Sequence, residues 1–150
     1  MKKIIVDTNI IFSCLLNTHG TIGDLIFNSD TVLDFYSNEY MRYEIRKHWQ
    51  RLRKISTLTD AELETAYDKI LTKVTFINED LIPEVIWEKA EILVAGIDID
   101  DIDFIALTRY LKAALWTGDK PLYEGLKTKR FRTVYNTAEM VRLRNKLAEQ

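Results

Sequence analysis

The sequence is poor in the residues that build several common kinds of site. One cysteine, Cys14, stands among 150 residues, which excludes an internal disulfide and a cysteine-based zinc site. Only five Gly and two Pro are present, and they form no low-complexity linker and no glycine-rich phosphate-binding loop. Hydrophobic residues make up 47% of the chain, so we expect one globular domain over residues 1–150.

Long apolar runs are also absent. After the first stretch, no segment approaches the roughly 18 apolar residues that a membrane-spanning helix needs. The N-terminal stretch superficially resembles a signal peptide, but Asp7 and Asn9 interrupt it, and a carboxylate costs about 2.5–3.5 kcal/mol on membrane insertion. Phe12 is bulky where a cleavage site favours small residues. We therefore expect a cytoplasmic protein without a membrane partner.

Positive charge is not in excess. The 21 Lys and Arg residues and 23 Asp and Glu residues leave a net charge of −2, which argues against an overtly basic nucleic-acid-binding protein. The distribution of charge reverses this argument. Residues 79–103 carry a net charge of −8, whereas residues 40–54 carry +5 and residues 125–146 carry +6. The total is thus a cancellation between one acidic region and two basic stretches.

Apolar patterning predicts strands that alternate with helices. Short apolar runs predict strands at residues 3–6, 31–36, 76–77, 113–117 and 134–135. Three- and four-residue spacing and capping signals predict helices over 22–27, from Ser37 through Leu52, from Thr59 through Val74, from Pro83 through Leu93, over 104–111, and from Thr137 onward. The alternation predicts an α/β layered domain with a mainly parallel sheet.

Acidic residues lie where the predicted strands end or helices begin. Asp7 ends the first strand, Asp119 follows the strand at 113–117, and four aspartates lie within residues 98–103. Ligands of open α/β sheets gather at the carboxyl ends of the strands. One aspartate there is often only a helix cap, and Asp98 and Asp100 also fit a solvated face, but four carboxylates exceed what capping uses. Carboxylates that gather at one point favour a hard divalent cation such as Mg²⁺.

Other acidic or histidine-based sites fail on spacing. A calcium-binding loop that starts at Asp98 requires Gly and Glu where Asp103 and Arg109 stand. An aspartate-nucleophile phosphatase requires Asp-x-Asp after the first strand, and Asn9 replaces the second aspartate. The two histidines, at positions 19 and 48, have no Ser or Cys partner pattern, so we interpret them as surface or structural residues.

The combined motifs resemble those of the PIN-domain ribonucleases. The motifs are Val6-Asp7-Thr8-Asn9, Glu44 inside a helix, Asp98-x-x-Asp101 followed by Phe104-Ile105-Ala106-Leu107, and Leu115-Trp116-Thr117-Gly118-Asp119-Lys120. Their order and spacing match from residue 4 to about residue 140. The resemblance implies a three-layer α/β/α domain with a mainly parallel sheet of about five strands. It also implies that acidic residues bind Mg²⁺ or Mn²⁺ and that the protein cleaves RNA.

The resemblance assigns roles to individual acidic residues. It places a metal-binding and catalytic quartet at Asp7, Glu44, Asp101 and Asp119. It makes Asp98 a second acidic position, peripheral to the metal ions.

Neighbouring polar residues receive weaker assignments. Asp103 stands where similar family members commonly have a small residue or proline, so its role stays open, and Asp100 is the weakest candidate ligand. Asn9 and Thr117 are expected to orient the carboxylates by hydrogen bonds, with local turn bonding as the alternative.

Basic residues near the acidic centre are expected to hold the RNA backbone. The candidates are Arg46, Lys47, Arg51 and Arg53 in the first basic stretch, and Lys129 and Arg130 in the second. Solvated basic faces are the alternative for both stretches. Tyr43 and Trp49 are interleaved with the first stretch and suggest stacking on unpaired bases, although Trp49 lies on the apolar stripe and fits the core better.

The resemblance extends to VapC-like toxins of bacterial toxin–antitoxin pairs, which are stand-alone PIN domains of this size. It implies a small antitoxin on a separate chain and a homodimer as partners. One competing interpretation is a catalytically inactive PIN-like scaffold that binds RNA or protein, against which the intact quartet argues. Another is a phospho-acceptor signalling domain, but Asp34 lies inside its predicted strand rather than at the end.

Overall fold

The computed structural model describes all residues from 1 to 150. The strands are β1 (Lys2–Val6), β2 (Leu33–Asn38), β3 (Val74–Ile77), β4 (Ala114–Trp116) and β5 (Val134–Tyr135). The helices are α1 (Thr8–Leu16), α2 (Thr21–Phe27), α3 (Tyr40–Lys47), α4 (Trp49–Ile55), α5 (Asp60–Lys73), α6 (Glu84–Val94), α7 (Ile102–Leu111), α8 (Lys120–Thr128) and α9 (Thr137–Ala148). Two short 3₁₀ turns, η1 (Glu79–Leu81) and η2 (Ile99–Asp101), precede α6 and α7.

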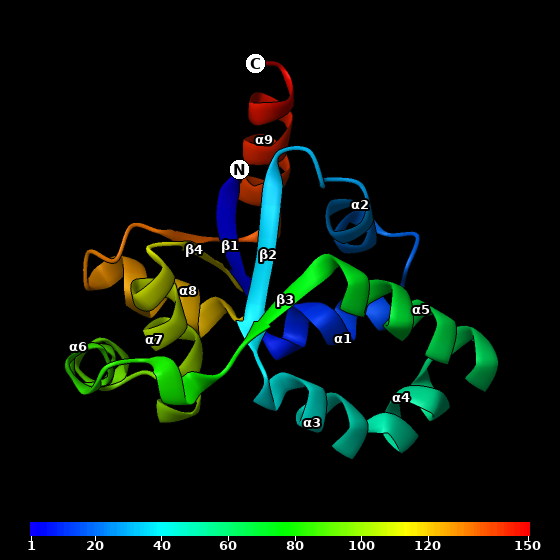
Figure 1. Ribbon diagram of the computed structural model, residues 1–150, viewed down its shortest axis with the longest axis horizontal. Helices are drawn as coiled ribbons and strands as arrows, with labels where there is room; N and C mark the ends of the chain where they lie inside the picture. The colour runs from blue at the N-terminus through cyan, green and yellow to red at the C-terminus, as the bar shows by residue number, and fades with distance from the viewer.

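The five strands form one parallel sheet in the order β3-β2-β1-β4-β5. Strand β1 pairs with β2 on one side, where Ile4 faces Phe35, and with β4 on the other, where Ile5 faces Leu115. The strand order therefore changes direction at β1, and ligand sites of open α/β sheets lie at such a switch point. In Figure 1 the carboxyl ends of β1, β2 and β3 converge near the start of α3.

Helices cover both faces of the sheet. Ile4 and Val6 of β1 lie in a core cluster with side chains of α1, α2, α4, α5 and α9, whereas Ile5 lies in a second cluster with side chains of α6, α7 and α8. This split follows from the alternation of side chains along a strand that is buried on both faces. Figure 1 shows α6, α7 and α8 on one side of the sheet and α1, α2 and α5 on the other. The prediction of a three-layer α/β/α fold is confirmed.

The second strand and the helix after it differ from the prediction. Strand β2 extends to Asn38, so Ser37 is a buried strand residue whose Oγ donates a hydrogen bond to the Val6 carbonyl (2.9 Å), not a helix cap. The single helix predicted through Leu52 is two helices that break at His48, whose φ and ψ are −101° and 14°. The apolar stripe continues across the break, because Met41 and Trp49 are both buried. The apolar stripe therefore predicted the buried residues correctly, but it did not predict the break between α3 and α4.

The other capping signals, after Ser37, were accurate to within a residue. The capping box that opens α5 is confirmed: Thr59 Oγ1 accepts from Glu62 N (3.2 Å), and Thr59 N donates to Glu62 Oε1 (2.9 Å). Pro83 is the N-cap of α6, whereas the prediction placed it in the first helical position. The N-cap of α9 is Asn136, one residue before the predicted cap Thr137. Val74 begins β3 instead of ending α5. Helices α1 and α8 were not predicted.

The N-terminal apolar stretch forms β1 and α1. Four residues of α1 are fully or almost fully buried in the core: Ile10, Ile11, Cys14 and Leu15. Taken singly, no helix of the protein has the length and apolar character needed to cross a membrane; α1 and α2 reach them only as a pair, bent by 109° at the break between them.

Candidate active site

Asp7 lies at the carboxyl end of β1 and begins α1. Its Oδ1 caps the helix by accepting from Ile10 N (2.9 Å), and its Oδ2 accepts from Thr117 Oγ1 (2.6 Å). The side chain is 3% exposed, and burial raises its pKa to about 6, with the charge of Asp119 adding to the rise against the lowering effect of the hydrogen bonds. Capping alone does not require so buried a carboxylate, and a charge in such a place is usually paired, metal-bound or functional.

Thr117 connects Asp7 with Asp119. The Thr117 hydroxyl donates to Asp7 and accepts from Asp119 N (3.0 Å), while Asp119 Oδ1 caps α8 by accepting from Leu122 N (3.0 Å). The parallel pairing of β1 with β4 places Val6 opposite Trp116, and this register brings the residues after both strands together. The contact expected for Thr117 is therefore present in the structure.

Asp101 differs from the other two aspartates because its side chain caps no helix. It lies at the N-terminus of α7, and its Oδ2 is buried without any hydrogen-bond partner, the one such side-chain atom in the protein. Burial, followed by the charges of Asp119, Asp98, Asp7 and Asp100, raises its pKa to about 7. An unsatisfied buried oxygen costs about 1–3 kcal/mol, so its presence calls for a physical explanation.

Glu44 approaches the same edge of the sheet from α3. Its Oε1 accepts a hydrogen bond from Oγ1 of Thr8 (3.2 Å), the residue that follows Asp7. A hollow of about 350 Å³ lies beside Glu44. Its walls are Thr8, Asn9, Phe12, Leu16, Glu44, His48, Arg51, Leu52 and Ile55. Glu44 is thus held at the border between the acidic edge and this hollow.

Two carboxyl groups that received no role from the sequence, Glu79 and Asp103, form a pair, and Glu79 lies near Glu44. Burial, the charge of Asp103 and a hydrogen bond with Asp103 raise the pKa of Glu79 to about 7, and Glu44 contributes to the rise. Burial also raises the pKa of Asp103. The only sequence signal for Glu79 was its place at the start of the acidic region, because the contact itself depends on the path of η1.

The remaining predicted polar residues lie at the margin of the site. Asp98 is exposed, and its Oδ1 accepts from Asp100 N (2.9 Å) in a local turn, so both lie outside the buried group. The Asn9 side chain is exposed and lines the hollow, and only its backbone acts on Asp7. Unlike Thr117, the Asn9 side chain is not placed to orient a carboxylate.

The donor set fits a hard divalent cation in chemistry but is not a closed cage. Asp7, Asp101 and Asp119 supply only carboxylate oxygens, which Mg²⁺ and Mn²⁺ prefer. A positive charge would relieve both the buried, partnerless Oδ2 of Asp101 and the raised pKa values of Asp7 and Asp101. As they lie here, no three His, Cys, Asp or Glu side chains are arranged to enclose a metal ion.

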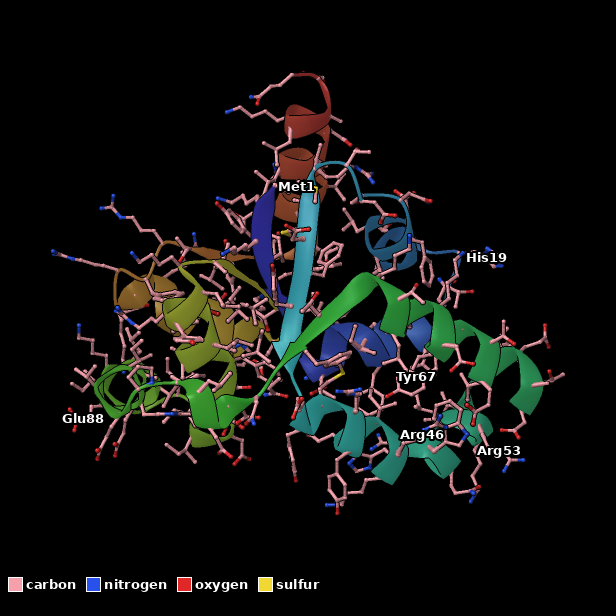
Figure 2. The ribbon with its side chains drawn as sticks, viewed as in Figure 1. Met1, His19, Arg46, Arg53, Tyr67 and Glu88 are labelled. Atoms are coloured by element: carbon pink, nitrogen blue, oxygen red, sulfur yellow. The ribbon has the colours of Figure 1, made fainter.

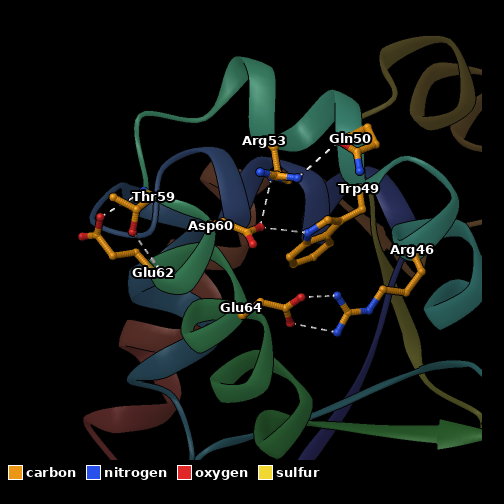
Figure 3. A network of polar contacts seen from close by, with 8 residues as sticks. All are labelled: Arg46, Trp49, Gln50, Arg53, Thr59, Asp60, Glu62 and Glu64. Atoms are coloured by element: carbon orange, nitrogen blue, oxygen red, sulfur yellow. Dashed lines mark hydrogen bonds and ion pairs between the residues drawn. The ribbon is translucent and has the colours of Figure 1, made fainter.

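Three of the six basic side chains expected to bind RNA are occupied by protein contacts. Arg46 forms a bidentate pair with Glu64 (2.7 and 2.9 Å), and Arg53 Nε lies 3.1 Å from Asp60 Oδ1, as Figure 3 shows. Figure 2 places Arg46 and Arg53 together at the corner formed by α3, α4 and α5. The Lys129 ammonium donates to the Ile92 carbonyl (3.1 Å) at the end of α6.

The other three basic side chains are more available. Lys47, Arg51 and Arg130 are exposed and form no ion pair. Of these, Arg51 lines the hollow beside Glu44. The structure therefore leaves Arg51 as an unpaired cation beside Glu44, and Lys47 as an exposed cation on α3.

Comparison with known proteins identifies the family. A family model of the PIN domain matches residues 5–139, nearly the whole chain, and the protein therefore belongs to the PIN-domain family. Members of this family are generally nucleases and generally use divalent metal ions. A search of curated proteins finds no match.

The fold is also similar to that of a solved structure. The crystal structure of VapBC2 from Rickettsia felis bound to a DNA fragment from their promoter contains a chain that superposes with a TM-score of 0.61 and 13% sequence identity. The match covers 89% of this chain and 98% of that chain. At this identity the likeness confirms the fold, including the three-layer arrangement around a parallel sheet.

Proposed function

We propose that this protein is a divalent-metal-dependent endoribonuclease that hydrolyses RNA phosphodiester bonds. The observation that carries the proposal is the group of Asp7, Asp101 and Asp119 at one edge of the sheet, in which the Asp101 Oδ2 is buried without a partner. Family membership supports it, since PIN domains are generally nucleases. A scaffold without catalysis has no need to keep such costly buried carboxylates.

The residues of the site have distinct roles in this proposal. Asp7, Asp101 and Asp119 would hold Mg²⁺ or Mn²⁺, and Glu44 would contribute directly or through water. A bound ion supplies activation of the attacking water and neutralisation of charge on the phosphate. Thr117 fixes the orientation of Asp7 through its 2.6 Å hydrogen bond, and Thr8 fixes Glu44 in the same way.

RNA binding requires positive charge beside the acidic edge. Lys47 and Arg51 supply it on the side of α3 and α4, and Arg130 is the exposed cation of the second basic stretch. Reversal of Arg51 to Glu is expected to weaken RNA binding and to reduce its salt dependence. The same reversal at Arg53 has a smaller effect on binding, because that side chain is paired with Asp60.

We further propose that the protein acts in the cytoplasm as the toxin of a toxin–antitoxin pair. The similar chain comes from the crystal structure of the VapBC2 pair. The partners of this protein would be a separate small antitoxin and a second copy of this chain. Leu16 and Ile55 are 36% and 57% exposed on the wall of the hollow beside Glu44, so a partner that covers them would also block the site. Co-expression with the product of a neighbouring small reading frame tests this: a stable, inactive complex supports it, and free, active protein contradicts it.

Cleavage of mixed RNA in Mg²⁺ or Mn²⁺ tests the enzymatic proposal. We expect wild-type protein to cut RNA, EDTA to stop the reaction, and Asp7→Asn and Asp101→Asn to lower the rate by at least about 100-fold. Asp98→Asn is the matched control, because Asp98 is exposed and bonds only within a local turn, and we expect it to retain most activity. Equal cleavage by wild type and Asp7→Asn would assign the activity to a contaminant.

A further inference from the structure

Two tyrosines stack on one another at the surface of α3. The ring centroids of Tyr40 and Tyr43 are 5.3 Å apart with the planes tilted by 33°, and the residues are 50% and 57% exposed. Neither ring belongs to the hydrophobic core. Exposure of aromatic surface to water is unfavourable, so covering it lowers the free energy, and the flat faces suit another planar ring.

The helix places this pair on the same side as Glu44. With 3.6 residues per turn, positions i, i+3, i+4 and i+7 share one face, and these positions are Tyr40, Tyr43, Glu44 and Lys47. Met41 and Ile45 form the buried face of the same helix. The tyrosine pair thus continues the candidate active site along α3, with a cation at its other end.

We propose that Tyr40 and Tyr43 form a stacking platform for an unpaired base of the RNA, next to the phosphate that is cleaved. The proposal rests on the proposed ribonuclease function and adds to it two residues that contact a base of the RNA. Every base has a π-face that stacks on an aromatic side chain, whereas bases inside a duplex are not accessible. Lys47, exposed on the same face of α3, and Arg51, on the wall of the hollow beside Glu44, would hold the adjoining phosphates.

The surroundings of Tyr40 indicate which bases fit. A hollow of about 510 Å³ beside Tyr40 is lined mainly by carboxyl groups. The other residues of its wall are Glu39, Asn78, Glu79, Asp80 and Asp103. Carboxylates repel a phosphate but accept hydrogen bonds from an exocyclic amino group, as Glu and Asp do from cytosine N4. The hollow therefore favours cytosine over uracil, because the two bases have the same ring size but only cytosine carries the exocyclic amino group.

Binding of short oligonucleotides tests the platform independently of cleavage. The affinity for fluorescently labelled eight-nucleotide RNAs, oligo(C) and oligo(U), is measured by fluorescence anisotropy. All variants carry Asp101→Asn, which prevents degradation of the RNA. We expect Tyr40→Leu and Tyr43→Leu each to weaken oligo(C) binding by about 5- to 150-fold, because stacking on one base is worth about 1–3 kcal/mol. We expect Tyr→Phe at either position to preserve binding. Ile92→Ala, at a residue 72% exposed on α6, is the control and leaves binding unchanged.

The outcomes separate this inference from the proposed function. Leucine variants that bind oligo(C) as tightly as the parent overturn the platform, even if wild-type protein cleaves RNA. Equal affinity for oligo(C) and oligo(U) overturns the role of the carboxyl-lined hollow. Leucine variants that keep RNA binding but lose a protein partner would show that the pair is a docking surface instead. Absence of both binding and cleavage in wild-type protein would overturn the proposed function itself.

Discussion

Two polar regions of the protein differ in whether their charged side chains are paired. At the corner of α3, α4 and α5, charges are neutralised in pairs: Arg46 with Glu64, and Arg53 with Asp60, which also accepts from Trp49 Nε1. We call this region the paired corner (Figure 3).

At the carboxyl edge of the sheet, Asp7, Asp101 and Asp119 gather without an ion pair to Lys or Arg, and the pKa values of the first two rise to about 6 and about 7. We call this region the acidic edge. The contrast indicates that the paired corner contributes to stability, whereas the acidic edge lowers stability and is explained by function.

The largest expected effect is a gain of stability when the acidic edge loses a charge. Asp7→Asn in metal-free protein at pH 8 is expected to raise the free energy of unfolding by about 2–3 kcal/mol, because one pKa unit corresponds to about 1.4 kcal/mol and Asp7 is 3% exposed. Asparagine keeps an oxygen to cap α1. Urea denaturation measures the change, with exposed Asp98→Asn as a control expected to stay within about 0.5 kcal/mol. A destabilised Asp7→Asn protein would contradict the contrast between the regions.

The pH dependence of stability gives a second test. The pKa values of Asp7 and Asp101 are higher in the folded protein than their ordinary values, so the folded state binds more protons than the unfolded state between about pH 4 and pH 7. The free energy of unfolding of metal-free protein therefore falls as the pH rises through this window. We expect a higher Tm at pH 5 than at pH 8, and a rise in Tm with Mg²⁺ at pH 8 that largely vanishes at pH 5.

A double variant isolates the cause of this pH dependence. In Asp7→Asn/Asp101→Asn protein, both the difference in Tm between pH 5 and pH 8 and the response to Mg²⁺ are expected to shrink. If the double variant keeps the full pH dependence, the effect comes from other groups and the acidic edge is not its source.

The smallest effect is expected at the paired corner. Glu64→Gln removes the charge that faces Arg46, and because both side chains are almost half exposed we expect a loss of only about 0.5–1 kcal/mol, measured by urea denaturation. RNA cleavage is expected to be unchanged. Glu124→Gln is the control, since its 4.0 Å pair with Lys120 is far more exposed and is expected to contribute nothing measurable. A clear loss of RNA cleavage in Glu64→Gln would mean that the paired corner is part of the site.

Local features of the fold could be predicted from the sequence because their causes are local. The capping box at Thr59 uses atoms three residues apart, and the apolar run of β1 needs only its own residues to indicate a buried strand. The break at His48 could not be predicted, since the apolar stripe passes through it and packing of α3 and α4 against other helices sets the bend. Helix α1 was missed because its almost continuous apolar residues show little periodicity.

The candidate site shows the same division. Asp7 and Asp119 were predicted because each follows a strand, and parallel strands end at one edge. The contact between Glu79 and Asp103 could not be predicted, because it depends on where η1 lies relative to α7. From the sequence, Arg46 and Lys47 were equally good candidates for RNA binding. Only the tertiary structure shows that Arg46 is paired with Glu64.

By itself, the sequence determined the α/β class, the order of its main elements and the acidic residues at the strand ends, since hydrophobic period, capping and position along the chain depend on neighbouring residues alone. The tertiary structure alone decided which charges are neutralised and which are not. Burial and pairing depend on residues far apart in the chain, as in the hydrogen bond that joins Thr117 to Asp7. For this reason the sequence could name candidate acids, but only the fold separates the acidic edge from the paired corner.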